Sequence, residues 1–463
     1  MSTSAKIGLN DDLTNSSALP RVDSLRLVAL GFLFVALLFG FFAVDHSPGA
    51  STHFRYDAEF IDSENRTADR VEVVNLVTAP VRIVLGVIGF AFFLIPTRQR
   101  LGWGGPIVFV LLMYLGFAGL SLLWSINPSV TLHKLVVLVC FGIAAAGLAR
   151  QFSMGELVFL FVAVCMSYIG IGVLVEILLG NFTPHKPDYR FVGTCHPNTL
   201  AVYGTFCCMA ASVYFGRLRT FDPWLIAIFV VGIITLLATK SRTTLAAFIF
   251  ALVAIRFLTF RPDKRVFLSA LAALGIIAGG VFLALSRSNV SRGLAGSMAM
   301  GRTEDVSSLT GRLPLWEELI RSINDHPLVG HGYLAFWEKE KIDYLSALLQ
   351  WEIPHGHNMY LDVTLDVGLI GLGLFLLMFI VSLYVTFRRV IVNHDRDVAL
   401  VFGLLVFALI HGFAESLFKM PTFLSFMLVT LLMRTALTDA AAKRPKFLDQ
   451  QKNTLRFDGG VGQ

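Results

Sequence analysis

Long runs of apolar residues alternate with short polar stretches over most of this chain. Residues 27–44, 83–95 and 369–385, for example, contain no charged side chain. A helix rises about 1.5 Å per residue, so roughly 20 apolar residues cross the hydrocarbon core of a bilayer, which is about 30 Å thick. The pattern therefore predicts an all-α fold, that of a polytopic integral membrane protein.

The apolar runs and the polar residues that interrupt them predict about twelve transmembrane helices. We expect these helices at residues 25–44, 73–96, 104–124, 132–149, 155–179, 196–216, 222–239, 243–260, 266–286, 358–386, 398–414 and 418–436. The predicted organisation is a tail at 1–24, helices within 25–286, one large loop at 287–357, helices within 358–436 and a second tail at 437–463. Both tails lack the apolar surface that a packed core needs.

Basic residues recur in every second connection between the predicted helices. The clusters are Arg98 and Arg100; Arg150; Arg217 and Arg219; Arg261, Lys264 and Arg265; Arg388, Arg389 and Arg396; and Lys443, Arg444 and Lys446. This is the positive-inside pattern, so we interpret the net charge of +6 as a sign of membrane orientation and not of nucleic-acid binding. Both ends of the chain are then cytoplasmic, and the loop at 287–357 lies on the opposite side.

Composition agrees with a membrane protein. Only 15% of the residues are charged, whereas soluble domains carry about a quarter. The five cysteines have no Cys-x-x-Cys spacing, and we interpret them as packing residues. The polar tail precedes the first predicted helix and no small-residue cleavage site follows it, so we expect no cleaved signal peptide.

Three short motifs lie in order along the large loop and its end. They are GRLPLW at 311–316, HPLVGHG at 326–332 and PHGHNMY at 354–360, and Gly368 and Gly371 follow. Each motif is weak alone. Their order, their spacing and their place between two apolar spans resemble the bacterial O-antigen ligase and Wzy-type polysaccharide polymerase family, including the ExoQ-like exopolysaccharide polymerases.

The resemblance implies a glycosyltransferase of the bacterial inner membrane with a periplasmic active site. Its donor would be an undecaprenyl-diphosphate-linked oligosaccharide or polysaccharide, and its acceptor a glycan or lipid A core. The segments GTCHPN at 193–198 and SRTTL at 241–245 look ExoQ-like and favour polymerisation of exopolysaccharide repeat units. An O-antigen ligase that transfers glycan to lipid A core is the alternative.

His355 and His357 stand where the loop re-enters the bilayer at the tenth predicted helix. A neutral imidazole can accept a proton from a sugar hydroxyl near neutral pH. From spacing alone, both could equally be helix-end residues bonded to the backbone. The resemblance implies that His357 is the catalytic histidine, whereas His355 stays a candidate for substrate binding. Asn358 is expected to cap the helix or to orient its neighbour.

Arginine is suited to a diphosphate because its guanidinium is always charged and binds phosphate oxygens in pairs. The resemblance implies this role for Arg312, and a similar one for Arg242 in the tight turn at 240–242. A charge at that depth is costly unless it faces a cavity, so Lys240 is a substrate-binding candidate too, with snorkelling to the surface as the alternative.

Further substrate-binding candidates are Arg82, inside the second predicted helix, Arg190, on an outward segment, and Trp316, whose indole could stack on a sugar. Trp316 could equally anchor an interfacial helix in the lipid headgroups, as could Trp337 and Trp351. His196 in HPN is more typical of a helix start, with Pro197 as the first helical residue.

Ionisable residues also fall within the predicted spans or next to their ends, and some are expected to pair with the arginines: Glu176, Asp362, Asp366, His411 and Glu415. The chain has no P-loop and no outward Asp-x-Asp pair, so we predict that the reaction uses no cofactor and no metal. A transporter or flippase is the rival class. Such proteins usually show two related halves, whereas here the polar residues concentrate in one loop.

Overall fold

The computed structural model describes residues 24–46, 83–97, 101–102, 104–186, 189–215, 222–259, 312–351, 353–417 and 422–442. Within these residues the protein is all-helical and has no β-strand, as predicted. The elements are α1 (Ser24–Asp45), a helix at Ile83–Leu94, α4 (Gly105–Leu120), η2 (Ser121–Leu123), α5 (Pro128–Gln151), α6 (Met154–Leu178), α7 (Pro197–Phe215), α8 (Pro223–Ala238), α9 (Arg242–Thr259), α12 (Arg312–Asp325), α13 (Lys339–Leu349), α14 (Met359–Asn393), α15 (Arg396–His411) and α16 (Phe423–Ala442).

Every predicted span that falls in the described residues corresponds to a helix. The predicted helix at 266–286, both predicted tails and Arg82 lie outside those residues. Among the described residues, five helices are long and apolar enough to cross a membrane: Gly105–Leu123, Pro128–Gln151, Met154–Leu178, Arg242–Thr259 and Met359–Asn393. The total of twelve spans stays a prediction.

Local sequence determines where several helices begin. The side chain of Asn127 accepts from the amide of Val130, and Pro128 follows as the first residue of α5. Ser153 and Glu156 form a reciprocal capping box at the start of α6. These contacts satisfy amide donors that the helix itself leaves unpaired, so polar residues define the ends of apolar segments.

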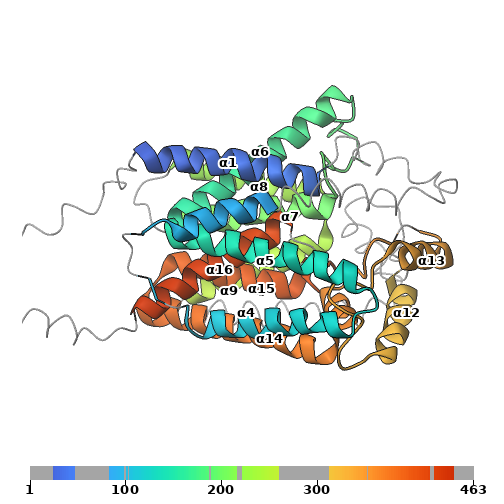
Figure 1. The fold of residues 1–463 in the computed structure, drawn as a ribbon. Coiled ribbons are helices and arrows are strands. Elements are labelled where there is room, and N and C mark those ends of the chain that lie inside the picture. Colours follow the sequence, from blue (N-terminus) through green and yellow to red (C-terminus); the bar gives the residue numbers. More distant parts are fainter. Residues whose placement is uncertain are drawn as a thin grey trace, which may run out of the picture.

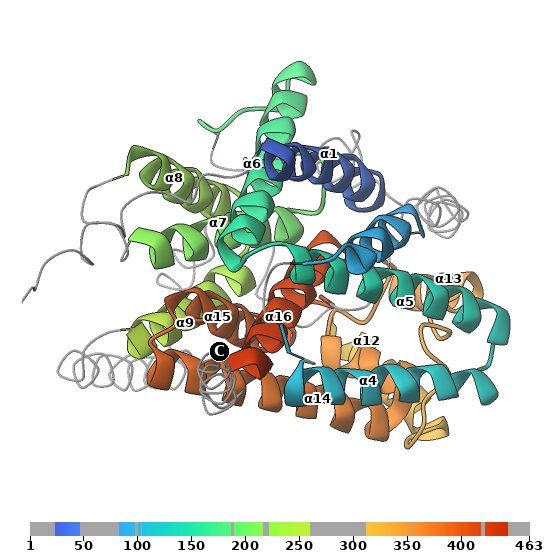
Figure 2. The same cartoon turned by 60° about the vertical axis from the view of Figure 1, so that its left-hand side comes forward.

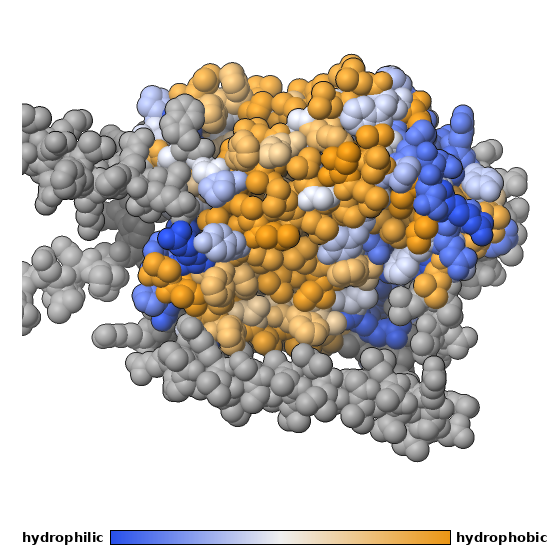
Figure 3. All heavy atoms as spheres, turned by 90° about the horizontal axis from the view of Figure 1, so that it is seen from below, coloured by the Kyte–Doolittle hydropathy of each residue, from blue (hydrophilic) through white to orange (hydrophobic). Residues whose placement is uncertain are grey.

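The long helices run side by side as a bundle, and α12 and α13 lie at one end of it (Figure 1). A second view shows α14 beside α4, and α9 beside α15 (Figure 2). Large apolar side chains are exposed on the outside, among them Phe39, Phe109 and Ile380. The face seen from below in Figure 3 is a broad apolar band with hydrophilic residues towards both ends. Such a surface suits a hydrocarbon environment and not water.

The two ends of the bundle differ in charge. Arg150, Arg389 and Arg396 lie at the end opposite α12 and α13, where Arg389 pairs with Asp395 at 2.5 Å. They belong to the predicted basic clusters, as does Arg388 next to Arg389 in α14. Their common position agrees with the alternation in the sequence. Which end faces the cytoplasm stays a prediction.

A loop after α12 interlocks with a break in α14. Gly368 has a φ of 66° and interrupts the helix. Across the break, the amides of Leu369 and Ile370 donate to the carbonyls of Pro327 and Leu328, and the amides of His331 and Gly332 donate to Leu365 and Asp366. All four distances lie between 2.8 and 3.1 Å. The interlock thus restores the hydrogen bonds that the break removes from α14.

Close backbone approach explains why glycine occupies this interlock. A Cβ atom at Gly368 would lie 2.2 Å from the carbonyl carbon of Leu328, and one at Gly330 would lie 2.6 Å from the amide nitrogen of Gly368. Both glycines also have positive φ, of 66° and 68°. The motif HPLVGHG at 326–332 and Gly368 of α14 therefore contact each other directly.

Helices α12 and α13 pack through a small apolar cluster of their own. Leu315, Leu319 and Ile342 are buried in it together with Leu365 of α14. Trp337 is only 8% exposed and donates to Asp362 Oδ1 at 3.0 Å, while Trp316 donates to the carbonyl of Gly356 at 2.9 Å. Both indoles bind within the protein. Headgroup anchoring therefore does not describe Trp337, which is a core residue.

Candidate active site

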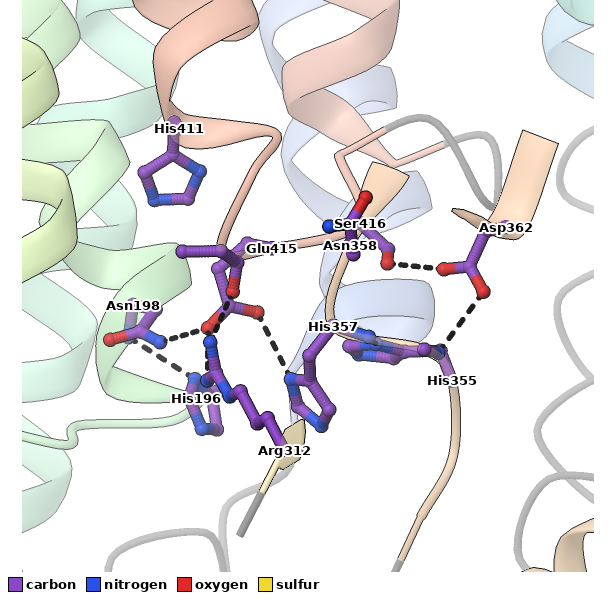
Figure 4. Close-up of polar contacts among 12 residues, drawn as sticks. His196, Asn198, Arg312, His355, His357, Asn358, Asp362, His411, Glu415 and Ser416 are labelled. Carbon is purple, nitrogen blue, oxygen red and sulfur yellow. Dashed lines mark hydrogen bonds and ion pairs between the residues drawn. The ribbon is translucent and has the colours of Figure 1, made fainter. Parts of the chain in front are cut away.

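One carboxylate joins functional candidates from distant parts of the chain. Glu415 lies in the connection 412–417 between α15 and α16, and its side chain is 11% exposed. Its Oε1 accepts from Arg312 Nη2 at 3.1 Å and from Asn198 Nδ2 at 2.5 Å, and its Oε2 lies 3.4 Å from His357 Nδ1. These side chains converge on Glu415 from α12, α7 and the segment before α14 (Figure 4).

Arg312 is the first residue of α12, and it docks that helix on the α15–α16 connection. Its Nη1 donates to the carbonyl of Ala414 at 2.6 Å, in addition to the contact of Nη2 with Glu415. The side chain is 21% exposed. A guanidinium carries five N–H donors, and these contacts use two. Further donors can therefore bind an anion while the ion pair persists.

His357 lies in an unusual backbone conformation with a φ of 46°. Its amide donates to His355 Nδ1 at 3.1 Å, and the centres of the two rings are 4.1 Å apart. The Trp351 ring lies at 5.6 Å on centres. Left-handed conformations are rare outside glycine and are often retained at functional sites. The turn directs the His357 ring towards Glu415.

The second ring nitrogen of His357 is the most informative atom of the site. Its Nε2 is buried and has no hydrogen-bond partner among the described residues. With Nδ1 facing a carboxylate, the neutral ring carries its proton on Nδ1 and a lone pair on Nε2. A buried acceptor without a partner typically costs about 1–3 kcal/mol. A hydroxyl group of a substrate would satisfy it.

The electrostatic environment keeps Glu415 ionised. Burial alone would raise the pKa of its carboxyl, but the hydrogen bond with His357 and the nearby imidazoles of His196 and His355 hold that pKa well below its ordinary value. Desolvation lowers the pKa of His196 to about 4, against the opposing pull of Glu415. At neutral pH the cluster therefore contains an anionic carboxylate and a neutral His196.

A hydrogen-bonded chain supports Glu415 from behind. Ser241 Oγ donates to Asn198 Oδ1 at 2.8 Å, and it lies 2.7 Å from Thr244 Oγ1. Thr244 Oγ1 in turn lies 3.0 Å from His411 Nε2. Residues of α9, of the turn before it and of α15 are thus linked to Glu415 by hydrogen bonds that pass through Asn198 of α7.

The remaining predicted residues lie around this cluster or beyond it. Asn358 caps α14, because its Oδ1 accepts from the amides of Tyr360 and Leu361 at 3.0 and 3.1 Å. Lys240 and Arg242 flank Ser241, and Arg190 Nε donates to the carbonyl of Thr239 beside them at 2.9 Å. Lys240, Arg242 and Arg190 are each half-buried. Trp316 contacts the backbone of Gly356, next to His357.

The structure also identifies the partners of the carboxylates that the sequence left open. Glu176 accepts from the Tyr189 hydroxyl and from the amides of Val192 and Gly193, at 2.6 to 2.9 Å. Glu415 is the carboxylate that pairs with Arg312. Glu415 lies between two helices, because α15 ends at His411 and α16 begins at Phe423, in agreement with the predicted spans at 398–414 and 418–436.

Asn198 is the site residue that the sequence interpretation missed, and Glu415 was expected to pair with an arginine but was not assigned to the site. One indication was available: with the predicted orientation, the connection after the eleventh span faces the same side as the large loop. An acidic residue there could have been matched with Arg312. Nothing in the spacing of HPN indicated that Asn198 contacts this carboxylate.

One group of side chains could also hold a metal ion. Ligand atoms of His355, His357 and Glu415 lie within 4.8 Å of one another. In the described part of the chain, however, both Arg312 and Asn198 already bind Glu415 Oε1. A cation would have to use Oε2, replace the contact with His357, and lie close to a guanidinium charge. The contacts present favour a site without metal.

An anionic carboxylate, an imidazole and a guanidinium gather at one end of an apolar helical bundle, and one nitrogen of the imidazole is buried without a partner among the described residues. They define a membrane protein with a polar reaction or binding site. Comparison with known proteins shows what the chain is similar to. Residues 227–376 match the family described as O-antigen ligase. This segment includes Lys240, Arg242, Arg312, His355 and His357.

Two kinds of relative are similar to the chain. It is 28% identical to the exopolysaccharide production protein ExoQ of Rhizobium meliloti (strain 1021), over 65% of this chain and 70% of ExoQ. It is 27% identical to a putative polysaccharide ligase of Rickettsia typhi, over 32% of this chain and 37% of that protein. A putative polysaccharide ligase of Rickettsia bellii is 31% identical, over 31% and 36% of the two chains. These matches support an O-antigen ligase/ExoQ-like family for the chain.

Proposed function

We propose that this protein is a membrane glycosyltransferase that moves a glycan from a polyprenyl diphosphate to a sugar hydroxyl. The observation that carries the proposal is the geometry of His357. Its Nδ1 faces Glu415 Oε2 at 3.4 Å, and its Nε2 is buried without a partner among the described residues. A base held in this way beside an arginine is suited to activating a hydroxyl near an anionic leaving group.

In the proposed reaction, His357 Nε2 accepts the proton of the acceptor hydroxyl while the hydroxyl oxygen bonds to the anomeric carbon of the donor. The bond between that carbon and the diphosphate oxygen breaks, and its electron pair departs with the polyprenyl diphosphate. Glu415 holds the Nδ1 proton and stabilises the imidazolium that forms. Because the displacement is a single step, the anomeric configuration inverts.

Charge stabilisation of the departing diphosphate is assigned to Arg312 and Arg242. Arg312 keeps N–H donors beyond those used by Glu415 and Ala414, and guanidinium pairs well with phosphate oxygens. Arg242 starts α9 directly after Ser241, which contacts the cluster through Asn198. Preformed positive charge at this point acts most strongly as the bond breaks. These arginines replace the metal ion that neutralises such leaving groups elsewhere.

The donor is assigned as an undecaprenyl-diphosphate-linked glycan, and the product as an exopolysaccharide chain. The similarity to ExoQ extends over 65% of this chain, whereas that to the putative polysaccharide ligase of Rickettsia typhi extends over 32%, and the difference supports exopolysaccharide over ligation. Ligation to lipid A core is the second possibility. The site is assigned to the outer face of the inner membrane, because the predicted basic clusters lie at the opposite end.

The roles are tested with purified full-length protein in lipid nanodiscs and a synthetic polyprenyl-diphosphate oligosaccharide. His357→Ala should still bind the donor but lose about 10²- to 10⁴-fold in rate, as expected for a missing general base. Arg312→Ala should lose both donor affinity and rate. Arg312→Lys should recover only part, because an ammonium keeps the charge without the paired donors.

His355→Ala is the comparison variant and should have a milder effect than His357→Ala. If His357→Ala turns over like the wild type while His355→Ala is inactive, the base has been assigned to the wrong histidine. If both retain activity, the acid–base mechanism is incorrect.

Polymerase and ligase differ in what a deletion strain accumulates. We expect single lipid-linked repeat units in the strain that lacks this protein, because unpolymerised donor would remain on its carrier. Long lipid-linked chains would instead indicate a ligase. Mass spectrometry of the extracted lipid-linked glycans distinguishes the two.

A further inference from the structure

Asn198 contacts the proposed catalytic carboxylate from a helix that the reaction scheme does not otherwise use. It is the second residue of α7, and its Nδ2 donates to Glu415 Oε1 at only 2.5 Å. Figure 4 shows its side chain directed at Glu415, next to Arg312 and His196. A residue in the first turn of a helix needs no side-chain contact with a distant carboxylate, so helix formation alone does not account for this one.

Glu415 determines which side of the Asn198 amide faces it, and a hydrogen-bond chain binds the other side. The Ser241 hydroxyl has one proton and donates it to Asn198 Oδ1. Thr244 must therefore donate to Ser241 across 2.7 Å, and His411 Nε2–H must donate to Thr244 across 3.0 Å. Because the Glu415 carboxylate only accepts, the amide presents its NH₂ group to Glu415 and cannot turn over without losing that contact.

This orientation affects how Arg312 binds. Arginine and a carboxylate prefer a paired arrangement in which two N–H groups bind both oxygens. Here Arg312 directs Nη1 to Ala414 and only Nη2 to Glu415, while Asn198 occupies the same Oε1. Because both donors bind Oε1, the other carboxylate oxygen, Oε2, is available to His357 Nδ1, which lies 3.4 Å away. Without Asn198, rotation of the carboxylate would let Arg312 take both oxygens.

We infer that Asn198, held by Ser241, is a positioning residue for the transfer reaction. It holds the Glu415 carboxylate in the orientation in which Oε1 binds Arg312 and Oε2 faces His357. The inference rests on the proposed function for its catalytic consequence. The orientation of the Glu415 carboxylate between Arg312 and His357 is a property of the free protein and can be measured without substrate.

Asn198→Asp is the decisive variant, because it has the same shape but puts a second carboxylate against Glu415. Two carboxylates at this distance must share a proton. When that proton leaves, the additional negative charge faces the charged and titratable groups around Glu415, which are His357, His196, His355, His411 and Arg312. His357 then stays protonated to higher pH and cannot act as a base. Because the base form of His357 then appears only at higher pH, the activity optimum should move to higher pH.

Asn198→Ala should lower kcat on the order of 10²-fold, the cost typical of a misplaced catalytic group, and leave the shape of the pH profile unchanged. Ser241→Ala should cause a smaller loss of the same kind. Ser212→Ala is the matched control, since Ser212 is also buried and bonded, but to Met209 further along α7. It should leave the rate and the pH profile as in the wild type.

The test measures pH–rate profiles of glycan transfer for these variants, together with ¹⁵N-histidine NMR spectra of the protein in nanodiscs without substrate. The His357 signals are assigned by their loss in His357→Ala. In wild type the spectra should show the Nδ1-protonated neutral ring, and in Asn198→Asp the doubly protonated ring at the same pH. Profiles and spectra of Asn198→Asp that superimpose on wild type would overturn the inference. Absence of transfer by wild type, with the spectral change present, would overturn the proposed function alone.

Discussion

At the scale of single residues, the proposed chemistry depends on one carboxylate with three partners. Glu415 combines an ion pair to Arg312, a contact to His357 and a hydrogen bond from Asn198 in a site that is about nine-tenths buried. A buried charge is tolerated only when its lone pairs are satisfied. Removing any partner therefore alters both the stability of the site and its charge.

The free energy of unfolding should depend on pH through two groups, His196 at higher pH and Glu415 at lower pH. The pKa of His196 is lowered to about 4 in the fold from about 6.5 in the unfolded chain, so the unfolded state binds more protons between these values. Stability should fall as the pH decreases from about 6.5 to 4, and His196→Gln should reduce that loss. Thermal unfolding in detergent, followed across this range, measures it.

The carboxyl group of Glu415 affects the free energy of unfolding at lower pH than His196 does. Its folded-state pKa lies below the unfolded value of about 4.3, so its contribution is present above that pH and is lost as the pH falls further. Glu415→Gln should remove the part of the acid destabilisation that appears below about pH 4. Equal destabilisation of the variant and the wild type there would contradict the assignment of the lowered pKa.

Metal dependence is a separate prediction at this scale. EDTA treatment of the purified protein should leave glycan transfer unchanged, because Arg312 and Asn198 occupy the carboxylate that a cation would need. Loss of transfer in EDTA that returns with a divalent cation would instead assign His355, His357 and Glu415 to a metal centre. Atomic emission analysis of the treated sample confirms that metal has been removed.

The sequence identified one half of this site. Arg312 and His357 occur in ordered motifs, and the structure brings both to the same carboxylate. Glu415 has no such motif, and it is 58 residues from His357 in the chain. Its partners depend on how α7, α12 and α15 pack, and a hydrophobic pattern carries little information on that packing. Arg82, also a candidate, lies outside the described residues.

At the scale of elements, apolar periodicity predicted helices well and their interruptions poorly. The tenth span was expected at 358–386, and α14 extends from Met359 to Asn393 with a break at Gly368. A glycine within an apolar run is common in membrane helices, so the break leaves no mark in hydropathy. The interlock with residues 327–332 becomes visible only when both segments are placed side by side.

The interlock should be sensitive to a single methyl group. Gly368→Ala forces a left-handed conformation on alanine, at roughly 1–3 kcal/mol, and brings its Cβ to 2.2 Å from the Leu328 backbone. We expect a clear decrease in melting temperature, or loss of folded protein, for this variant and for Gly330→Ala. Fluorescence-detected size-exclusion chromatography of heated samples measures both.

Gly373→Ala supplies the matched control on the same helix. Its Cβ would meet no atom within 4 Å, and alanine favours the helix by about 1 kcal/mol over glycine. This variant should melt at or above the temperature of wild type. If all three variants behave alike, the two glycines of the interlock have no special role.

At the scale of the whole molecule, position along the bundle connects fold and function. The polar cluster and α12–α13 lie at one end, and Arg150, Arg389 and Arg396 lie at the other (Figure 1). Since polyprenyl-linked donors are embedded in the bilayer, the site needs only to face one membrane surface. A site on the outer surface has no access to cytosolic nucleotide sugars, so orientation limits the donor.

Cysteine labelling at both ends tests the orientation. Arg321 on α12 is 72% exposed, and Asn393 at the end of α14 is exposed at the opposite end of the bundle. In intact spheroplasts of the expressing bacterium, an impermeant thiol reagent should label Arg321→Cys, and it should label Asn393→Cys only after lysis. The parent protein, whose native cysteines are buried or half-buried, gives the background. The reverse pattern would place Glu415 and His357 in the cytoplasm, where a nucleotide sugar could serve as donor, and the polyprenyl-diphosphate mechanism would lose its topological basis.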